Sequence, residues 1–126
     1  MKMMHVTIMT KCLNESVDFY QKQAGLHIRM DGRCNQEHPI VFLADAEGDT
    51  CIELVGNPAS VYYGGGISIG FRTDDIRREH ADKEAAGLRP GPMISPNPHT
   101  QFFFIKDPNG VEIQFVQEDE MRFTQI

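Results

Sequence analysis

The stretch FFFIKDPNGVEIQFV, residues 102–116, decides the fold of this chain. A strand pattern enters it, the residues DPNG turn the chain, and a second strand pattern leaves it. Pro108 stands where its fixed φ suits a type I turn, and Gly110 stands where a positive φ is expected. The stretch therefore predicts two antiparallel strands joined by a tight turn, in which the turn residues have a structural role.

The strand that leaves this turn has one apolar and one polar face. Side chains alternate along a strand, so Val111, Ile113 and Phe115 share one face while Glu112 and Gln114 share the other. The apolar face is suited to packing under a helix. The polar face is either exposed to solvent or part of a site.

The composition indicates one soluble, acidic domain spanning residues 1–126. The chain is 40% hydrophobic, which is enough for a core, and its net charge is −6. An acidic chain lacks the basic surface that a phosphate backbone needs, so we expect no nucleic-acid partner. No apolar run is long enough to span a bilayer, so we expect no membrane partner either.

The cysteines indicate a reducing compartment. Cys12, Cys34 and Cys51 make an odd count with no C-x-x-C pair, and we expect free thiols. The first residues, MKMMHVTIMTK, lack the long apolar segment of a signal peptide. A cytoplasmic location is the simplest inference.

The order of elements repeats. The first half predicts a strand in MMHVTIMT, a helix over residues 13–24, and strands near 26–33, 40–44 and 50–55. After the glycine-rich YYGGG, the second half predicts a strand in GISIGFRT, a helix in DDIRREHADKEAAG, and strands near 88–94, 101–106 and 111–117. Each half is therefore strand, helix, strand, strand, strand. This predicts an α+β fold of two tandem βαβββ modules, residues 1–56 and 67–117, with a link over 57–66 and a tail over 118–126.

Local signals support these halves. We expect Asn14 and Asp74 to cap the two helices, and Gly25 and Gly87 to end them. The triplet AGL occurs at residues 24–26 and again at 86–88, 62 positions later. The AEGD stretch of the first half predicts a hairpin turn equivalent to DPNG in the second.

The repeat makes four polar strand positions equivalent. His5 corresponds to about Ser68, and Glu53 to about Gln114. Polar residues on the free face of a half-covered sheet are common, so each one alone has an ordinary structural explanation. A histidine and a carboxylate at symmetric strand positions, however, are the ligand types that divalent Zn, Ni, Co, Mn or Fe use in proteins.

These segments resemble the vicinal oxygen chelate superfamily, which includes glyoxalase I, the bleomycin and fosfomycin resistance proteins and the extradiol dioxygenases. The resemblance rests on HVTIMTKCLNESVDFYQKQAGL, CIELVG, ISIGFRTDDI and FFFIKDPNGVEIQFV. It implies two βαβββ modules whose cupped mixed sheets form a cleft for a small molecule, and it implies a homodimer. The cleft is completed within one chain or across the dimer.

The resemblance also implies a ligand set. Carried over by position, the metal ligands of glyoxalase I fall on His5, Glu53, Ser68 and Gln114. The first two match, whereas Ser68 stands where glyoxalase I usually has His and Gln114 stands where it has Glu. We therefore expect His5, Glu53 and Gln114 as metal ligands, and Glu53 as the catalytic carboxylate. The extradiol dioxygenase pattern of two His and one Glu fits less well.

Three further residues are candidates for binding the substrate, namely Ser68, Arg72 and Glu112. Arg72 can clamp a substrate carboxylate or pair with a neighbouring acid. Glu112 can substitute as a base or be an exposed charge. The loop SPNPHT places His99 either over the cleft or in solvent, and the tail is either frayed or strapped across a partner through Phe123.

Two functions follow from this pattern. The first is a glyoxalase-like enzyme with metal-assisted lyase or isomerase chemistry on a substrate with vicinal oxygens. Because Ser68 and Gln114 depart from the usual ligands, we expect weak metal binding and a reaction other than efficient glutathione-dependent glyoxalase activity. The alternative is a metal-free small-molecule or antibiotic-binding protein of the resistance type. Its aromatic lining would come from Phe102, Phe104, Tyr62 and Tyr63.

Overall fold

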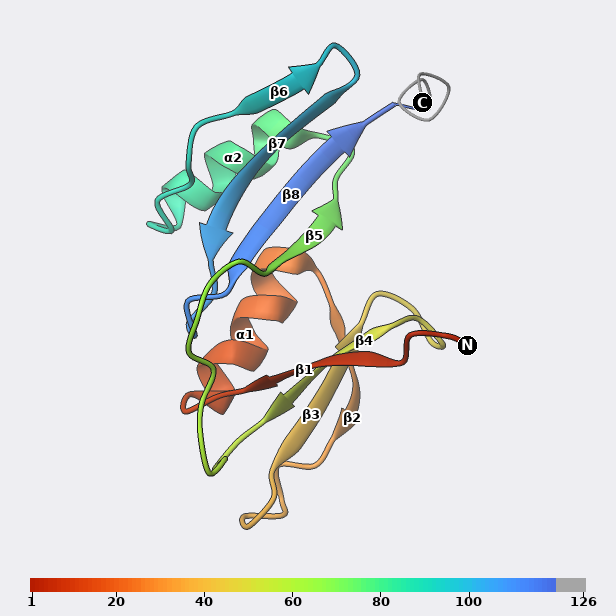
Figure 1. Ribbon diagram of the computed structural model, residues 1–126, viewed down its shortest axis with the longest axis vertical. Helices are drawn as coiled ribbons and strands as arrows, with labels where there is room; N and C mark the ends of the chain where they lie inside the picture. Colours follow the sequence, from red (N-terminus) through yellow and green to blue (C-terminus); the bar gives the residue numbers. More distant parts are fainter. Residues whose placement is uncertain (120–126) are drawn as a thin grey trace. The chain divides into compact units, whose positions relative to one another are not determined.

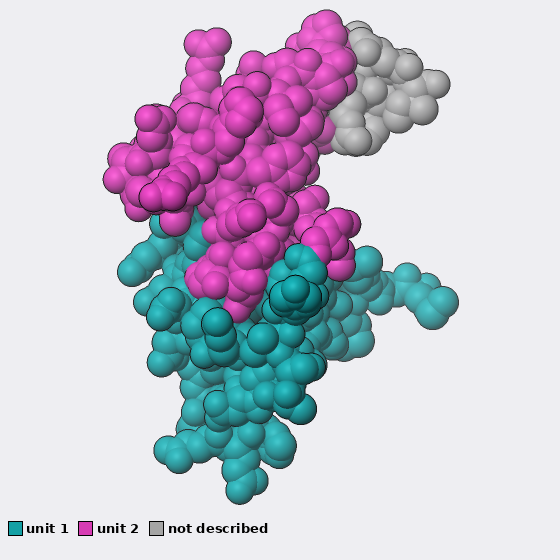
Figure 2. Space-filling model, turned by 60° about the vertical axis from the view of Figure 1, so that its left-hand side comes forward, with its two compact units in different colours: residues 1–64 teal, residues 65–126 magenta. Residues whose placement is uncertain are grey.

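The structure is a computed structural model that describes residues 1–119 (Figure 1). The chain divides into two compact units, Met1–Gly64 and the part from Gly65 onward, which Figure 2 shows in two colours. Each unit runs strand, helix, strand, strand, strand, so the two predicted βαβββ modules are confirmed.

Unit one is a four-stranded mixed sheet with one helix. Its elements are β1 (His5–Met9), α1 (Leu13–Ala24), β2 (His27–Asp31), β3 (Ile40–Ala44) and β4 (Cys51–Val55). The strand order is β1-β4-β3-β2. Strands β1 and β4 are parallel, and the other neighbours are antiparallel.

Unit two repeats this arrangement. Its elements are β5 (Ser68–Arg72), α2 (Ile76–Ala85), β6 (Ile94–Asn97), β7 (Thr100–Lys106) and β8 (Glu112–Glu118). The strand order is β5-β8-β7-β6, with β5 parallel to β8. Helix α2 covers one face of this sheet and leaves the other face free of helices (Figure 1).

The two parallel strand pairs have the same register. In unit one the paired residues include His5↔Cys51 and Thr7↔Glu53, and in unit two they include Ser68↔Glu112 and Gly70↔Gln114. His5 and Ser68 are therefore equivalent, and so are Glu53 and Gln114. The sequence predicted this equivalence from the repeat of about 62 positions, and the register of the parallel strands shows it directly.

The apolar face of each sheet forms the core beneath its helix. In unit one, Tyr20 and Val17 of α1 are buried, as are Leu43 and Leu54 of the sheet. Burying such side chains stabilises the fold by about 1.5–3 kcal/mol each. On β4, Ile52 and Leu54 are buried, whereas the alternate residues are only half-buried. This strand therefore has one covered and one free face, as its alternation predicts.

Unit two builds its core from aromatic and branched residues. Phe103 and Phe115 lie on neighbouring strands and stack with ring centroids 5.4 Å apart. Ile113 beside them and Ile76 of α2 are also buried. The strand that leaves the DPNG turn therefore points Ile113 and Phe115 into the core, as its alternation predicts.

Helix α2 is anchored by an unusual residue. Its sequence, IRREHADKEA, is strongly charged, and its buried residues are Ile76 and Lys83. The Lys83 side chain is 3% exposed, and its Nζ lies 2.7 Å from Glu79 Oε2 and 4.6 Å from the centre of the Phe115 ring. Lys83 thus serves as an apolar stem that covers the sheet and as an ammonium group with an ionic and an aromatic partner.

The DPNG turn is held by its first residue. Asp107 is 5% exposed, and its Oδ1 accepts hydrogen bonds from the backbone N–H groups of Asn109 and Val111 at 2.8 and 2.9 Å. Gly110 has φ +87° and donates its N–H to the Asp107 carbonyl at 3.1 Å. The predicted hairpin turn is confirmed, because aspartate supplies the local acceptor and glycine the left-handed conformation.

One predicted strand is wrong. Residues 88–93 are not a strand, and β6 begins at Ile94 instead. Pro90 and Pro92 lack the N–H that a ladder needs, and Arg89 has φ +53°, which is left-handed. Part of the predicted loop SPNPHT is consequently strand, and the turn between β6 and β7 lies at Pro98 and His99.

The bounds predicted for the first helix, residues 13–24, match α1, but the predicted N-cap residues are wrong, by two positions in α1 and by one in α2. Cys12 precedes α1 without a side-chain cap, and Asn14 lies within the helix, where its Oδ1 accepts a hydrogen bond from Arg33. Asp75 rather than Asp74 caps α2, accepting from the Arg78 N–H at 3.1 Å. Capping propensity in the sequence indicates which residue types can begin a helix. Tertiary contacts, such as that between Asn14 and Arg33, decide which position does so.

The helix ends agree with the sequence. Gly25 and Gly87 have φ +66° and +75°, as the predicted stops require. The link contains Gly64 and Gly66, both with positive φ, and Tyr63 beside them is 98% exposed.

The remaining predictions concern the cysteines, membranes and the tail. Within residues 1–119, none of the three cysteines forms a disulfide. Neither helix within residues 1–119 has the length and apolar character needed to cross a bilayer. Strand β8 continues to Glu118, and Phe123 with the rest of the predicted tail lies outside the described residues.

Candidate functional site

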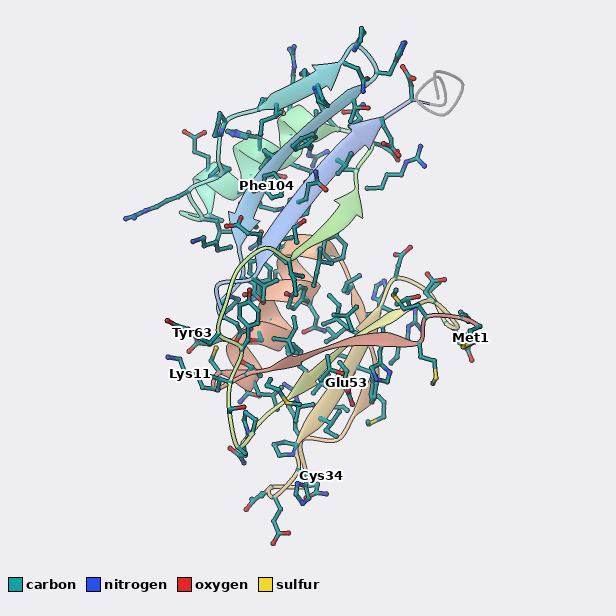
Figure 3. All side chains as sticks on the ribbon, viewed as in Figure 1. Met1, Lys11, Cys34, Glu53, Tyr63 and Phe104 are labelled. Atoms are coloured by element: carbon teal, nitrogen blue, oxygen red, sulfur yellow. The ribbon has the colours of Figure 1, made fainter. Side chains whose placement is uncertain are left out.

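Strand pairing in unit one brings His5 and Glu53 together. They lie on the adjacent strands β1 and β4 and project from the free face of the sheet, because their neighbours Ile8, Ile52 and Leu54 point into the core. His5 Nε2 lies 3.5 Å from Glu53 Oε1. Figure 3 shows Glu53 on this sheet.

Two further side chains hold this pair. Thr7 lies opposite Glu53 in the register and donates its hydroxyl to Glu53 Oε1 at 2.5 Å. The His5 ring meets Phe42 of β3 edge to face, with centroids 5.7 Å apart. The Glu53 side chain is 15% exposed and His5 37%, so the pair is accessible and yet positioned.

The spacing of the pair suits a shared metal ion. Two ligand atoms at about 2.1 Å from one ion, at angles of about 90–110°, lie about 3.0–3.4 Å apart. The separation of 3.5 Å is close to this range, and the Thr7 hydroxyl is a typical outer partner for a ligating carboxylate. Unit one therefore offers two donors whose chemistry and spacing fit a divalent ion.

Unit two offers weaker donors at the equivalent positions. Ser68 is exposed and carries a neutral hydroxyl, and Gln114 is half-buried. Gly70 opposes Gln114, and a Cβ at Gly70 would lie 3.2 Å from Gln114 Oε1, so the glycine leaves room for the amide. Among residues 1–119, no group of three or more His, Cys, Asp or Glu side chains is placed to hold a metal.

Glu112 lies at the start of the same free face. It pairs with Ser68 in the register, and its Oε1 lies 3.9 Å from Lys106 Nζ. Together with Phe104, which Figure 3 labels, Glu112 and Ser68 line a hollow of about 350 Å³.

A second hollow, of about 420 Å³, lies further along this face. Its polar lining comes from Arg72, Asn97, Thr100, Gln114 and Glu118, and Phe102 and Val116 are among its apolar lining. The structure thus brings the predicted residues Arg72 and Gln114 together in one concavity. Phe102 and Phe104 also lie on this face, with ring centroids 5.7 Å apart.

Sequence reasoning missed Thr100. It is 8% exposed, and its hydroxyl has no hydrogen-bond partner within residues 1–119. The signal was present, since Thr100 shares the alternation of Phe102 and Phe104 along β7. This signal was hidden because Thr100 is the last residue of SPNPHT, whose prolines predict a loop.

Two other predicted residues lie elsewhere. His99 is in the β6–β7 turn, where its Nδ1 lies 2.9 Å from Asp119 Oδ2, and it does not line the 420 Å³ hollow. Tyr63 is almost fully exposed in the link.

The comparisons with known proteins agree with this geometry. The sequence model of the glyoxalase/bleomycin resistance protein/dioxygenase superfamily matches residues 2–115. The chain belongs to this superfamily. The predicted resemblance to the vicinal oxygen chelate proteins is confirmed. A search among curated proteins finds no match.

Several solved structures have the fold of this superfamily member. The trypanothione-dependent glyoxalase I of Leishmania major is 21% identical, with a TM-score of 0.76 over 99% of this chain and 92% of that one. A variant of the fosfomycin resistance protein FosX from Listeria monocytogenes, complexed with Mn(II) and 1S,2S-dihydroxypropylphosphonic acid, is 13% identical. Its TM-score is 0.81, over 99% and 98% of the two chains.

A third solved structure is described as that of an antibiotic-binding protein. TnmS3 from Streptomyces sp. CB03234 is 21% identical, with a TM-score of 0.74 over 94% of this chain and 97% of that one. These likenesses establish the fold of this superfamily member and leave its ligand open.

Proposed function

We propose that the chain is a glyoxalase-like protein that binds a small molecule with vicinal oxygens and promotes a metal-assisted lyase or isomerase reaction on it. The observation that carries this proposal is the pair His5 Nε2 and Glu53 Oε1, 3.5 Å apart and braced by Thr7. The pair has the chemistry and spacing of two ligands to one divalent ion. Zn, Ni, Co, Mn and Fe are all compatible with these donors.

The other donors of the site come from the second unit. We propose that Gln114, from the same chain or from a second copy in a homodimer, completes the ligand set through its amide oxygen. Ser68 lies at the fourth position, where its hydroxyl is a poor ligand, so we assign it to the substrate together with Arg72 and Glu112. A position without a strong protein ligand is left open to water or substrate.

The chain's own groups have distinct roles in this proposal. A divalent ion, when bound, would polarise the vicinal oxygens of the substrate. Glu53 Oε1 accepts the Thr7 hydroxyl, which leaves Oε2 as the oxygen that can take a proton from a carbon beside a carbonyl. Gln114 cannot take this role because an amide is not a base at neutral pH. Glu53 is therefore the proposed catalytic residue.

The site has only one carboxylate among the four family positions, which limits the reaction. Glyoxalase I uses a carboxylate where this chain has Gln114, so we expect a reaction other than efficient conversion of the methylglyoxal–glutathione adduct. An ordinary glyoxalase rate on that adduct would contradict this expectation.

A second function is favoured by the hollows of unit two. Phe102, Phe104 and Val116 give this face an apolar lining, which a metal-free antibiotic- or small-molecule-binding protein needs. Affinity for a metal separates the two proposals. We also propose, from the family and the free thiols, that the protein works as a homodimer in the cytoplasm.

The first experiment is a metal titration of the untagged, chelator-treated protein. Zn, Ni, Co and Mn are titrated calorimetrically into the parent chain, His5→Ala and Glu53→Ala. The matched controls His38→Ala and Glu37→Ala remove the same residue types from exposed positions in the β2–β3 connection. We expect one site of micromolar affinity that only the first two variants abolish, and a roughly 10–100-fold loss in Thr7→Val.

The contrary result is equally clear. Absence of binding, or binding that is unchanged in His5→Ala and Glu53→Ala, would overturn the enzyme proposal and leave the metal-free binding protein.

A further inference from the structure

We propose that the 420 Å³ hollow of unit two recognises a small carboxylic acid with an apolar body, and that Arg72 and Thr100 bind its carboxylate. The hollow is formed by unit two alone, so the binding itself needs no metal. The inference deepens the proposed function, and rests on it only in assigning this acid as the substrate class.

Thr100 is the first observation. Its side chain is more than nine-tenths buried, it lines the hollow, and its hydroxyl has no partner within residues 1–119. A buried hydroxyl without a hydrogen bond costs about 1–3 kcal/mol, and proteins seldom keep one without a use. A ligand oxygen in the hollow would satisfy it.

Arg72 supplies the charge. Within residues 1–119 its guanidinium makes a single hydrogen bond, from Nη2 to the Glu118 carbonyl at 3.4 Å, and no ion pair. Arg33, by contrast, is paired with Asp31 at 2.6 Å. The remaining donors of Arg72 are therefore open to a ligand, and a planar guanidinium suits a carboxylate in a two-point contact.

The rest of the lining sets the class of acid. Phe102 and Val116 give the hollow apolar walls for a hydrocarbon or aromatic body. The carboxylate of Glu118 is also part of the lining, and it repels a second negative charge. A monoanion is thus favoured over a phosphonate or phosphate dianion.

A neighbouring hollow does not suit the same ligand. Thr100 also lines a smaller hollow of about 290 Å³, whose lining includes Glu118 and Asp119 but no arginine or lysine. An anion there would meet two carboxylates, and the one histidine of the lining, His99, already pairs with Asp119 at 2.9 Å. The Arg72 side of Thr100 is therefore the anion-binding side.

The test uses phenylacetate as the probe and the full chain in the presence of a chelator. Binding is measured by NMR titration and calorimetry, with phenylacetamide as the uncharged analogue and phenylphosphonate as the dianion. We expect phenylacetate to bind at least tenfold more tightly than either analogue. We expect Arg72→Gln to weaken it about tenfold or more, and the matched exposed control Arg77→Gln to leave it unchanged.

Two variants separate binding from folding. Thr100→Val should fold normally, because the hydroxyl makes no bond, and should weaken phenylacetate several-fold, whereas Thr100→Ser should retain binding. Glu118→Gln should tighten it by removing a like charge.

The inference is overturned if phenylacetate fails to bind, if phenylacetamide or phenylphosphonate binds as tightly, or if Arg72→Gln and Thr100→Val have no effect. Because the chelator removes metal, these outcomes do not depend on the metal titration. Loss of metal binding with intact phenylacetate binding would refute only the proposed enzyme.

Discussion

Lys83 provides the sharpest test of how unit two is stabilised. The residue is 3% exposed, contacts Glu79 and the Phe115 ring, and shares with Ile76 the burial of helix α2 against the sheet. Three substitutions separate its contributions. Lys83→Ala removes the stem and the charge, Lys83→Met keeps the stem, and Glu79→Gln keeps the ammonium but removes its charged partner.

The three substitutions should lower the free energy of unfolding by different amounts. Lys83→Ala loses about three buried methylenes at about 0.8 kcal/mol each, plus the aromatic contact, and should cost about 3 kcal/mol. Lys83→Met should stay within about 1 kcal/mol of the parent, because losing the ion pair is offset by no longer burying an ammonium. Glu79→Gln should cost about 1–2 kcal/mol, less than for a fully buried pair, since Glu79 is 32% exposed.

The assay is urea unfolding followed by circular dichroism and by tyrosine fluorescence. Coincident transitions are required before a free energy of unfolding is assigned, because the chain has two units. Asp82→Asn is the matched control, since Asp82 pairs with Arg78 at 3.9 Å on the exposed side of the same helix and should change stability by less than about 0.5 kcal/mol. If Lys83→Met costs as much as Lys83→Ala, the reasoning that the stem rather than the charge anchors α2 is refuted.

Three shorter predictions concern other parts of the chain. Asp107→Ala should lower stability by about 2–4 kcal/mol in urea unfolding, since two turn N–H groups lose their acceptor; a loss below about 1 kcal/mol would contradict the assigned role. Gly70→Ala should leave the melting temperature nearly unchanged and weaken phenylacetate binding, because the new Cβ displaces the Gln114 amide; unchanged affinity would argue against it. Hydrogen bonding to Arg33 holds the pKa of Asp31 below its ordinary value, so the ion pair stabilises the fold above about pH 4 and this contribution fades as the pH falls further. Melting curves of Arg33→Gln should therefore approach those of the parent at low pH, and a constant difference would exclude the linkage.

Much of the fold could be predicted from the sequence because its signals are local. Alternation along the strand after the turn fixes which face is buried, and the DPNG turn needs only Asp107 and Gly110 to form. The failures occur where tertiary context decides. Pro90 and Pro92 deny residues 88–93 a ladder, and the prolines of SPNPHT predicted a loop where the strand Ile94–Asn97 lies.

The site was only partly accessible to sequence reasoning. The equivalence of His5 with Ser68 and of Glu53 with Gln114 follows from the repeat, because the parallel strand pairs of the two units have an equivalent register. The orphan hydroxyl of Thr100 could not be predicted, since whether a threonine finds a hydrogen-bond partner depends on every neighbouring element. The burial of Lys83 was missed for a similar reason, because a charged helix of low amphipathicity has no sequence signal for the residue that turns inward.

The link between the units has a practical consequence for handling the protein. Gly64 and Gly66 have positive φ, Tyr63 beside them is exposed, and no strand of either unit passes through this segment. An insertion or a chain break there would leave every strand pair and both helices continuous. The gene could therefore be divided at this point into two cistrons, so that each unit could be produced and labelled on its own.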